Sequence, residues 1–257
     1  MNVAIAGAGG RMGRTLIDAV LADDELRLAV ALEAAGSPAL GQAVGGVTIG
    51  AALDALGAAE VLVDFTRPEG TLTHLDACLR LGKAVVIGTT GFSEPQRARI
   101  GEAARRLPIV LSPNFAIGVN VVFRLAQTAA KALGDAYDVE IVEAHHRHKV
   151  DAPSGTALKL GELVAAALGR DLGKVATHGR SGETGERPAK AIGFHAIRGG
   201  DIVGEHTVIF AGQGERVEVA VRSQSRMTYA AGALRAAKWL RGRGPGLYDM
   251  FDVLGLK

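Results

Sequence analysis

The sequence predicts an α/β fold in which a doubly wound parallel sheet is joined to a smaller α+β region with a mixed sheet. Three observations lead to this prediction. Up to about residue 116, short apolar runs alternate with helix-like segments, which is typical of βα units. A glycine-rich stretch, 7–13, stands where the first apolar run meets the first helix-like segment. After Pro113, a long helix pattern and a series of strand patterns replace the alternation.

The elements of the first region follow one another at short intervals. Apolar runs predict strands at 3–6, 28–32, 61–65, 84–87 and 109–111. Helical periodicity predicts helices at 12–22, 69–81 and 94–106. Gly82 stands where a helix-capping glycine is expected, and Ser93 with Gln96 forms a capping-box pattern before the third helix.

The second region opens with a helix pattern at 119–133, a strand pattern at 139–144 and a helix pattern at 156–168. Residues 170–190 are polar and glycine-rich, so we expect a long mobile loop there. Strand patterns follow at 191–197, 206–210 and 216–221, and a helix pattern at 229–240 ends the series. This order fits a sheet with helices on one face.

Composition excludes several classes of protein. The chain has 257 residues, of which 48% are hydrophobic and 22% charged, enough for one large or two modest domains with a real core. Its 29 basic and 27 acidic residues give a net charge of +2, and the few aromatic residues do not interleave with basic ones. We therefore expect no binding to nucleic acid.

Disulfide and membrane classes are also disfavoured. Cys78 is the single cysteine, so an intrachain disulfide is excluded and a buried hydrophobic role is expected. The most apolar window, 115–134, contains Arg124 and Lys131 and is therefore not expected to span a membrane. No signal-peptide pattern follows Met1, and we expect a cytoplasmic protein.

Residues 3–14 have the pattern of a strand, a glycine-rich turn and the start of a helix. Glycine permits the positive φ and the close backbone approach that such a turn needs. The helix N-terminus then offers free N–H groups to a pyrophosphate. The strict dinucleotide fingerprint has its last glycine where Met12 stands, and here Gly13 follows one residue later. The loop predicts a Rossmann-type site for NAD or NADP.

Glu33 is the second feature of this predicted cofactor site. It ends the next predicted strand, where a carboxylate accepts hydrogen bonds from the ribose hydroxyls of the adenosine. Arg11 and Arg14 are candidates for a 2′-phosphate contact, so NADH and NADPH both remain open on these residues. The turns 88–91 and 112–115 follow strands at the ligand-binding edge, although ordinary turn chemistry explains them equally well.

Five consecutive residues can carry positive charge: His145, His146, Arg147, His148 and Lys149. Such a cluster is unfavourable unless an anion lies nearby, and histidine can transfer a proton near neutral pH. The turn that follows precedes a helix pattern, with Thr156 as its expected N-cap, and a helix N-terminus can bind a carboxylate. We therefore expect an acidic small molecule to be bound and protonated here.

The basic cluster has two other interpretations. A metal site is disfavoured because the interleaved Arg147 and Lys149 would repel a cation and no zinc-type spacing is present, so no metal is expected. A structural role would explain any one of the histidines but not all five residues.

The chain resembles the dihydrodipicolinate reductase family over its whole length. The most specific segment is 143–157, Glu-Ala-His-His-Arg-His-Lys-Val-Asp-Ala-Pro-Ser-Gly-Thr-Ala. Further matching segments lie at 3–14, 64–71, 86–92, 114–120, 204–207 and 225–228.

This resemblance implies a reaction and a set of site residues. NADH or NADPH would reduce a dihydropyridine dicarboxylate, formed from the 4-hydroxy compound by loss of water, to tetrahydrodipicolinate on the diaminopimelate route to lysine. His145 would donate the proton with help from Lys149, and the dicarboxylate would be bound by His146, Lys149, Gly155 and Thr156. Cofactor contacts are implied for Gly7, Ala8, Gly9, Gly10, Arg11, Met12, Glu33, Gly88, Thr89, Thr90, Pro113, Asn114, Phe115 and Ala116.

The resemblance also implies domains and assembly. Residues 1–116 and 226–257 would form the dinucleotide-binding domain, and 117–225 the substrate-binding domain through which a homotetramer assembles.

Two departures from the family pattern bear on the site. Ala34 stands where many bacterial relatives have arginine, which favours NADH or dual use through Arg11, and Ala116 lacks a common serine hydroxyl.

Two other functions remain as alternatives. One is another NAD(P)-dependent dehydrogenase of amino-acid metabolism, which the histidine-rich run disfavours. The other is a non-catalytic NAD(P)-sensing protein, in which the basic cluster would have no chemical task.

Overall fold

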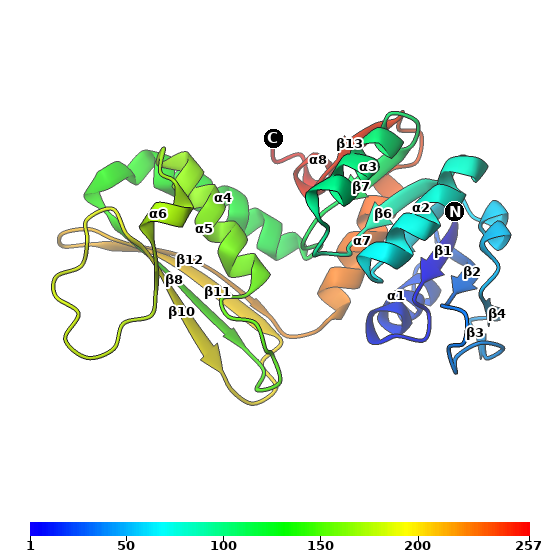
Figure 1. The fold of residues 1–257 in the computed structure, drawn as a ribbon, viewed down its shortest axis with the longest axis horizontal. Helices are drawn as coiled ribbons and strands as arrows, with labels where there is room; N and C mark the ends of the chain where they lie inside the picture. The colour runs from blue at the N-terminus through cyan, green and yellow to red at the C-terminus, as the bar shows by residue number, and fades with distance from the viewer. The chain divides into compact units, whose positions relative to one another are not determined.

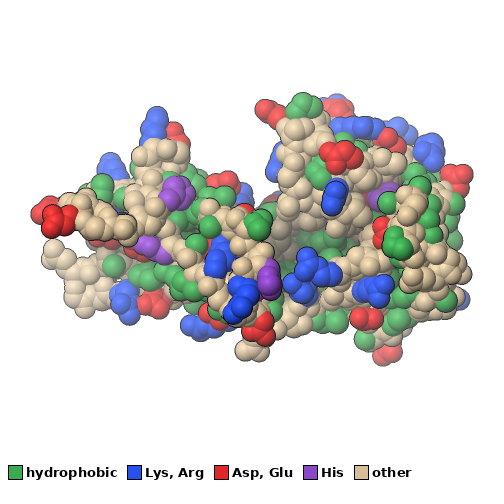
Figure 2. Space-filling view, turned by 60° about the horizontal axis from the view of Figure 1, so that its bottom comes forward, with side chains coloured by type: hydrophobic (Ala, Val, Ile, Leu, Met, Phe, Trp, Pro, Cys, Tyr) green, Lys and Arg blue, Asp and Glu red, His purple; other side chains and the backbone are tan.

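The computed structural model describes all residues, 1–257, and they form two compact units (Figure 1). The first unit consists of Met1–Ile117 and Arg226–Lys257, and the second of Gly118–Ser225. The C-terminal segment thus belongs with the N-terminal half of the chain. No helix in either unit is long and apolar enough to cross a lipid bilayer. On the face seen in Figure 2, Lys and Arg side chains lie among Asp and Glu.

The first unit is built on an eight-stranded sheet with the order β13-β7-β6-β5-β1-β2-β4-β3. All strand pairs are parallel except β3 with β4. The strands are β1 (Asn2–Ala6), β2 (Arg27–Leu32), β3 (Ala43–Val44), β4 (Val47–Gly50), β5 (Val61–Asp64), β6 (Ala84–Ile87), β7 (Pro108–Leu111) and β13 (Gly246–Tyr248). The helices are α1 (Arg11–Leu21), η1 (Leu53–Ala58), α2 (Pro68–Leu81), α3 (Glu94–Ala104), α7 (Met227–Trp239) and α8 (Met250–Leu254).

Alternate residues of β1 belong to two different cores, which confirms the predicted doubly wound sheet. Val3 and Ile5 pack in one apolar cluster with residues of α1 and α7. Ala4 and Ala6 pack in a second cluster with residues of α2 and α3. Strands buried on both faces in this way appear in the sequence as continuous apolar runs rather than as alternating patterns. Figure 1 shows the two helix layers on opposite sides of the sheet.

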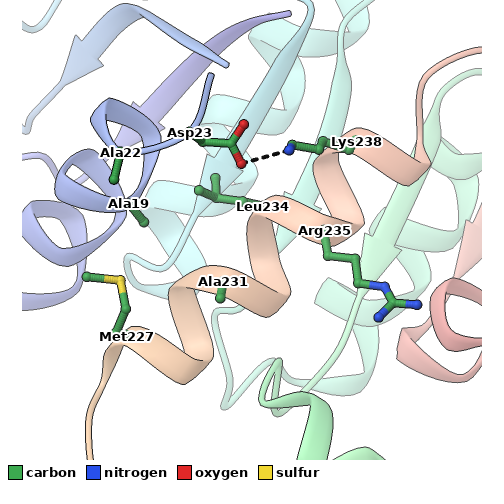
Figure 3. Close-up of a pocket in the computed structure, with 8 residues that line it drawn as sticks. All are labelled: Ala19, Ala22, Asp23, Met227, Ala231, Leu234, Arg235 and Lys238. Atoms are coloured by element: carbon green, nitrogen blue, oxygen red, sulfur yellow. Dashed lines mark ion pairs between the residues drawn. The ribbon is translucent and has the colours of Figure 1, made fainter. Parts of the chain in front are cut away.

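The last long helix, α7, packs beside α1, as Figure 3 shows. Lys238 of α7 forms ion pairs with Asp23 at 2.7 Å and Glu25 at 3.0 Å, just beyond the end of α1. Small side chains, among them Ala19 and Ala231, leave a shallow groove of 380 Å³ between the two helices. This contact ties the returning C-terminal segment to the first βα unit.

The order of the sheet decides where a ligand can bind. From β1 the chain first adds β2 and β4 on one side, and then returns to place β5 on the other side. In parallel sheets, ligands bind beyond the carboxyl ends of the strands at such a reversal. The loops that follow β1, β2, β5, β6 and β7 therefore meet at one edge of the sheet.

Several predicted boundaries are confirmed by their caps. Gly82 ends α2 with φ 64°, the left-handed conformation expected of a C-terminal glycine. The Ser93 N–H donates to Gln96 Oε1 at 2.8 Å, as the capping-box pattern before α3 requires. The sequence patterns did not reveal β3, β4, η1, β13 and α8. These elements are short and depend on neighbouring strands or helices rather than on their own periodicity.

The second unit contains a five-stranded mixed sheet with the order β12-β11-β8-β10-β9. The central strand β8 is parallel to β10 and antiparallel to β11. The strands are β8 (Asp138–His145), β9 (Ala176–His178), β10 (Ile192–Arg198), β11 (Gly204–Ala211) and β12 (Arg216–Ser223). The helices are α4 (Ile117–Leu133), η2 (Gly134–Ala136), α5 (Gly155–Ala167) and α6 (Leu172–Val175), and Figure 1 shows α4 and α5 on one side of the sheet, as predicted.

The region 170–190 differs from the loop that the sequence predicted. It begins with the short helix α6 and the strand β9, which pairs with β10, and only the residues after His178 lack regular structure. Arg180 and Arg187 from this later part donate hydrogen bonds to Glu140 of β8 at 2.8–3.1 Å. Although burial opposes ionisation, these bonds and one with His195 lower the pKa of Glu140 to about 2. An ionic network therefore attaches the loop to the sheet.

Candidate active site

The glycine loop joins β1 to α1 in the first unit and exposes the N-terminus of that helix. Gly7 has φ 68°, and its carbonyl accepts the Gly10 N–H at 2.9 Å to form a tight turn. A Cβ atom on Gly13 would lie 2.0 Å from the Gly7 carbonyl oxygen, so only glycine allows the helix to pack this close. No side chain caps α1 and no acidic residue occupies its first turn. Its first N–H groups can therefore meet an anion.

A cavity of 930 Å³ opens beside this loop. It is lined by residues after β1, β2 and β5 and by the start of α7: Gly7, Gly10, Arg11, Met12, Gly13, Glu33, Ala34, Phe65, Thr66, Arg67, Glu69, Gly70, His74, Arg226 and Tyr229. The volume is within the range of small-molecule and cofactor sites. The basic residues of the lining are Arg11, Arg67, Arg226 and His74. Its acidic residues are Glu33 and Glu69.

Glu33 lies where the sequence predicted an acceptor for ribose hydroxyls. Its carboxylate accepts the Gly9 N–H at 2.8 Å through Oε2 and the Ala34 N–H at 3.0 Å through Oε1. These bonds join the loops after β1 and β2 and hold the carboxylate at the cavity wall. Arg11 lines the cavity, whereas Arg14 is directed to its own loop, with Nε donating to the Gly9 carbonyl at 3.2 Å.

The predicted residues after β6 and β7 do not line this cavity, but they connect to its wall. A Cβ atom on Gly88 would lie 2.1 Å from the Phe65 ring, so the two loops are in close contact. Thr89 Oγ1 is hydrogen-bonded to Thr71 Oγ1 at 2.8 Å. The Phe115 ring lies 5.4 Å from the Phe65 ring, centroid to centroid.

The remaining predicted cofactor residues lie in the same loops. Asn114 Oδ1 accepts the Ala116 N–H at 2.9 Å, which shapes the turn that begins at Pro113. Thr90 follows Thr89 beyond the end of β6, and Ala8 is buried behind the glycine loop.

The sequence patterns did not identify a polar network centred on Asp64, at the end of β5. Its buried carboxylate accepts the Thr66 N–H at 2.9 Å and the Thr66 hydroxyl at 2.6 Å, and it lies 2.7 Å from His74 Nδ1. The sequence offered two signals, the predicted strand 61–65 that contains Asp64 and the matching family segment 64–71, and neither indicated this network. Free helix amides, a glycine-lined approach and the fixed Glu33 carboxylate together fit a dinucleotide in this cavity.

In the second unit, the basic cluster begins at the last residue of β8 and continues into a turn. The β8 strand ends at His145, so the five cations do not alternate across a strand. His145 is buried, whereas Arg147 and His148 are exposed. No group of three or more histidine, cysteine or acidic side chains is arranged to hold a metal ion.

Glu143 is the central partner of His145. It is 1% exposed, and its Oε2 lies 2.6 Å from His145 Nδ1. Its other oxygen accepts the Ser154 N–H at 3.1 Å, and Arg198 donates to both oxygens at 2.7 Å. Burial raises the pKa of Glu143, but the hydrogen bonds from Arg198 and His145 outweigh this and lower it. Glu143 is therefore ionised at neutral pH, and His145 Nδ1 carries a proton that it donates to the carboxylate.

Burial also controls the protonation of the two neighbouring histidines. It lowers the pKa of His145 in spite of the Glu143 carboxylate, and the positive charges of Lys149 and Arg198 act in the same direction. The His206 ring lies edge-on to His145 with centroids 5.1 Å apart, and its Nε2 is hydrogen-bonded to Ser154 Oγ at 2.9 Å. Burial, with the nearby His145, lowers the pKa of His206 to about 4, so it is neutral near pH 7.

Lys149, the other residue expected in catalysis, is held by an acidic neighbour. Its Nζ lies 2.8 Å from both carboxylate oxygens of Asp151, and this bond lowers the pKa of Asp151. The ammonium group is therefore paired with a carboxylate of its own loop. His146, expected to bind substrate, has a buried Nδ1 without a partner.

The predicted N-cap of α5 was wrong. Ser154 is the N-cap, because its Oγ accepts the Ala157 N–H at 3.1 Å, and Thr156 lies within the first turn. The sequence did not distinguish Ser154 from Thr156, because serine and threonine are both good N-caps and these two stand two residues apart. Gly155 and Thr156 still lie at the helix N-terminus, beside the Ser154 backbone that Glu143 holds.

Two family models match the chain, and together they cover nearly all of it. "Dihydrodipicolinate reductase, N-terminus" matches residues 1–115, and "Dihydrodipicolinate reductase, C-terminus" matches residues 118–254. Among curated proteins, the 4-hydroxy-tetrahydrodipicolinate reductase of Thiobacillus denitrificans is 59% identical and that of Nitrosomonas europaea 56% identical, each over 265 aligned residues. Both alignments cover 100% of this chain and 99% of the relative.

Solved structures agree in fold. A dipicolinate-bound dihydrodipicolinate reductase from Paenisporosarcina sp. TG-14 is 25% identical, with a TM-score of 0.79 and 98% of each chain covered. A probable dehydrogenase from Thermotoga maritima, 10% identical with a TM-score of 0.63, shares the fold alone. On the matches to both family models and to full-length relatives above half identity, the chain belongs to the dihydrodipicolinate reductase family.

Proposed function

We propose that this protein is an NAD(P)H-dependent 4-hydroxy-tetrahydrodipicolinate reductase. It would reduce its substrate, by way of dihydrodipicolinate, to tetrahydrodipicolinate on the diaminopimelate route to lysine. The observation that carries this proposal is the buried His145–Glu143 pair inside a cationic cluster, in a chain that matches reductases of this name from end to end. Reduction of the ring of a dicarboxylate needs an acid that supplies a proton to the ring. It also needs fixed positive charge that stabilises the negative charge of the substrate.

The first unit is the cofactor-binding part in this proposal. The glycine loop from Gly7 to Met12 lies against the pyrophosphate, which accepts hydrogen bonds from the free amides at the start of α1, and Glu33 accepts hydrogen bonds from the adenosine ribose. Residues 88–90 and 113–116, at the same sheet edge, contact the remaining part of the cofactor. When bound, NADH or NADPH supplies the hydride for the reduction.

The second unit binds the substrate and delivers the proton in this proposal. His146, Lys149, Gly155 and Thr156 bind the two carboxylates, with the α5 N-terminus adding its partial positive charge. In its protonated form, His145 donates a hydrogen bond from Nδ1–H to Glu143 and transfers its Nε2 proton to the substrate. Lys149 stabilises the negative charge that develops on the reduced ring and assists the transfer.

NADH is the preferred cofactor in this proposal. Ala34 offers no cation to a 2′-phosphate, which leaves Arg11 of the same cavity for dual use, and the Glu33 carboxylate itself repels a 2′-phosphate. The ratio of kcat/KM for NADH and NADPH measures this preference. A tenfold preference for NADPH, about 1.4 kcal/mol, would contradict it.

A homotetramer in the cytoplasm completes the proposal. The side of the second sheet opposite α4 and α5 carries no helix in Figure 1, and Ile197 of β10 is 52% exposed. An uncovered sheet face with exposed apolar residues is a common basis for assembly. Light scattering coupled to size-exclusion chromatography would measure the oligomeric state. A monomer at micromolar concentration would contradict this part of the proposal.

The decisive experiment supplies the substrate directly. The product of dihydrodipicolinate synthase is added to the protein with NADH or NADPH, and cofactor oxidation is followed by absorbance. Oxidation that depends on this product supports the proposal. Oxidation with only another amino-acid-derived substrate would indicate a different dehydrogenase. Binding of the cofactor without oxidation of it would indicate a sensing protein.

A further inference from the structure

Arg198 occupies a position that neither its sequence context nor the matched motifs distinguished. It is the last residue of β10 and lies directly opposite His145 in the parallel pairing of β10 with β8. Its Nη1 donates to Glu143 Oε2 and its Nη2 to Glu143 Oε1, each at 2.7 Å. Nη2 also donates to the Asp151 carbonyl at 2.7 Å. One guanidinium group therefore joins the partner of His145 to the loop that carries Lys149.

We infer that Arg198 is a positioning residue for proton delivery. It fixes the Glu143 carboxylate against His145 and, through Asp151, holds the loop of Lys149 in place. It touches neither substrate nor cofactor in this inference and acts only through these neighbours. The inference rests on the proposed function for its effect on turnover, but its effect on His145 can be measured without any reaction.

The geometry of the Glu143 carboxylate explains why a guanidinium is needed. Glu143 is 1% exposed, and a buried carboxylate without a paired cation would take up a proton or turn away. The planar fork of arginine satisfies both oxygens at once and still has a donor for the Asp151 carbonyl. A lysine at this position keeps the charge but cannot bind these acceptors in the same fixed geometry.

The charges around His145 make the inference specific. Four ionisable groups contact it or act on its pKa: Glu143 on its own strand, Arg198 on β10, His206 on β11, and Lys149 in the loop, which is itself paired with Asp151. Glu143 raises the pKa of His145, whereas burial, Lys149 and Arg198 lower it. His206 adds no charge near neutral pH, because its own pKa is about 4. If Arg198 acted on His145 by its own charge alone, loss of Arg198 would raise the His145 pKa. As a positioning residue it keeps Glu143 ionised and in place, so its loss should lower the His145 pKa, as loss of the Glu143 charge does.

The test compares Glu143→Gln, Arg198→Gln and Arg198→Lys with the unaltered protein. NMR titration of protein labelled at histidine follows the His145 ring without substrate or cofactor. We expect the His145 pKa to fall in both Glu143→Gln and Arg198→Gln, and to fall less in Arg198→Lys, which keeps the positive charge beside Glu143. The matched control is Arg147→Gln, since the Arg147 side chain is exposed, and there the titration should be unchanged. A rise of the His145 pKa in Arg198→Gln would mean that Arg198 acts only by its own charge, and either that rise or an unchanged pKa would overturn the inference.

Kinetics then test the consequence for turnover. We expect kcat of Arg198→Gln to fall about 10- to 100-fold, the loss expected when a catalytic group is displaced by about 1 Å. Arg198→Lys should recover part of this loss, and cofactor affinity should stay within about twofold in both variants. A variant that loses kcat and cofactor affinity together would show general damage and contradict a positioning role. Failure of the proposed function is distinguishable, because the unaltered protein would then not oxidise the cofactor at all, whatever the titrations show.

Discussion

The sites of the two units consist of different chemical groups. In the first, the ligand-facing groups are mainly backbone: the amides at the start of α1, the Gly7 turn and the close packing at Gly13. The second site is a network of side chains from three strands and a loop, connected by hydrogen bonds and ion pairs: Glu143, Arg198, His145, His206 and Lys149. A backbone site should be sensitive to added atoms, and a side-chain site to the loss of charge or of a proton.

The largest expected effect is on His145, the proposed acid of the second unit. In His145→Gln, the glutamine can still bond to Glu143, but it cannot supply a proton. We expect kcat to fall about 10²–10⁴-fold, with only a modest change in cofactor affinity, because general acid catalysis contributes about this much. Steady-state kinetics with the substrate and titration with NADH measure the two quantities. His148→Gln, at an exposed ring with no assigned role, is the matched control. Near-normal turnover in His145→Gln would remove His145 from the acid role.

The next effect tests the backbone site of the first unit. In Gly13→Ala, the new methyl group would lie 2.0 Å from the Gly7 carbonyl oxygen, so the loop and α1 must move apart. Strain of this kind costs about 1–3 kcal/mol. If this strain destabilises the loop conformation that binds the cofactor, the affinity for NADH drops about 5- to 150-fold.

Fluorescence titration with NADH measures the effect of Gly13→Ala. Gly101→Ala is the control, because Gly101 also lies in a helix of the first unit but a Cβ atom there meets nothing within 4 Å. That variant should bind NADH normally and be slightly more stable, since alanine favours helix. Equal affinities in the two variants would mean that the close approach at Gly13 is not needed for cofactor binding.

The same contrast explains which parts of the molecule could be predicted from the sequence. The doubly wound sheet and the glycine loop were predictable because each strand, turn and cap depends on residues close together in the sequence. The caps at Gly82 and at Ser93 with Gln96 are examples. The basic cluster was visible as a run of residues. The strands β3, β4 and β13 were not, because they are two to four residues long and exist only beside another strand.

The partners within the second site required the tertiary structure. Arg198 lies 55 residues from Glu143 in the sequence, and His206 lies 52 from Ser154. Only the pairing of β8 with β10 and β11 brings them together. Lys149 and Asp151 are close in the sequence, but the pattern of charges alone does not predict which carboxylate pairs with an ammonium group. Side-chain networks across strands are thus the part that local sequence signals leave open.

A smaller effect is expected when a side chain adds charge to the backbone site. Ala34→Arg places a cation next to Glu33 at the cavity wall. A charge-assisted bond to the 2′-phosphate should raise kcat/KM for NADPH relative to NADH about tenfold, or about 1.4 kcal/mol. Ala35→Arg adds the same charge at an exposed residue that does not line the cavity, and should leave the ratio unchanged. The same change of ratio in both variants would indicate a general effect of charge rather than a contact at residue 34.

The smallest effect concerns Asp151, which holds the ammonium group of Lys149 in the absence of substrate. If a substrate carboxylate must replace Asp151, then Asp151→Asn frees Lys149 and lowers KM without changing kcat. The side chain of Asp151 is 57% exposed, and such ion pairs are worth at most about 1 kcal/mol, so KM should fall no more than about fivefold. The Asp151 carbonyl remains available to Arg198 in this variant. Asp201→Asn, an exposed acidic residue without an ion pair in the same unit, is the control.

The pKa of Asp151 fixes the conditions for this last comparison. Hydrogen bonding to Lys149 lowers that pKa, so the carboxylate stays charged and competes throughout the neutral range. The difference in KM between Asp151→Asn and the unaltered protein should therefore be the same at any pH near neutrality. It should shrink with added salt, which screens exposed pairs. A higher KM in Asp151→Asn would mean that Asp151 supports the substrate site instead of competing for Lys149, and the ionic network would then extend one residue further into the loop.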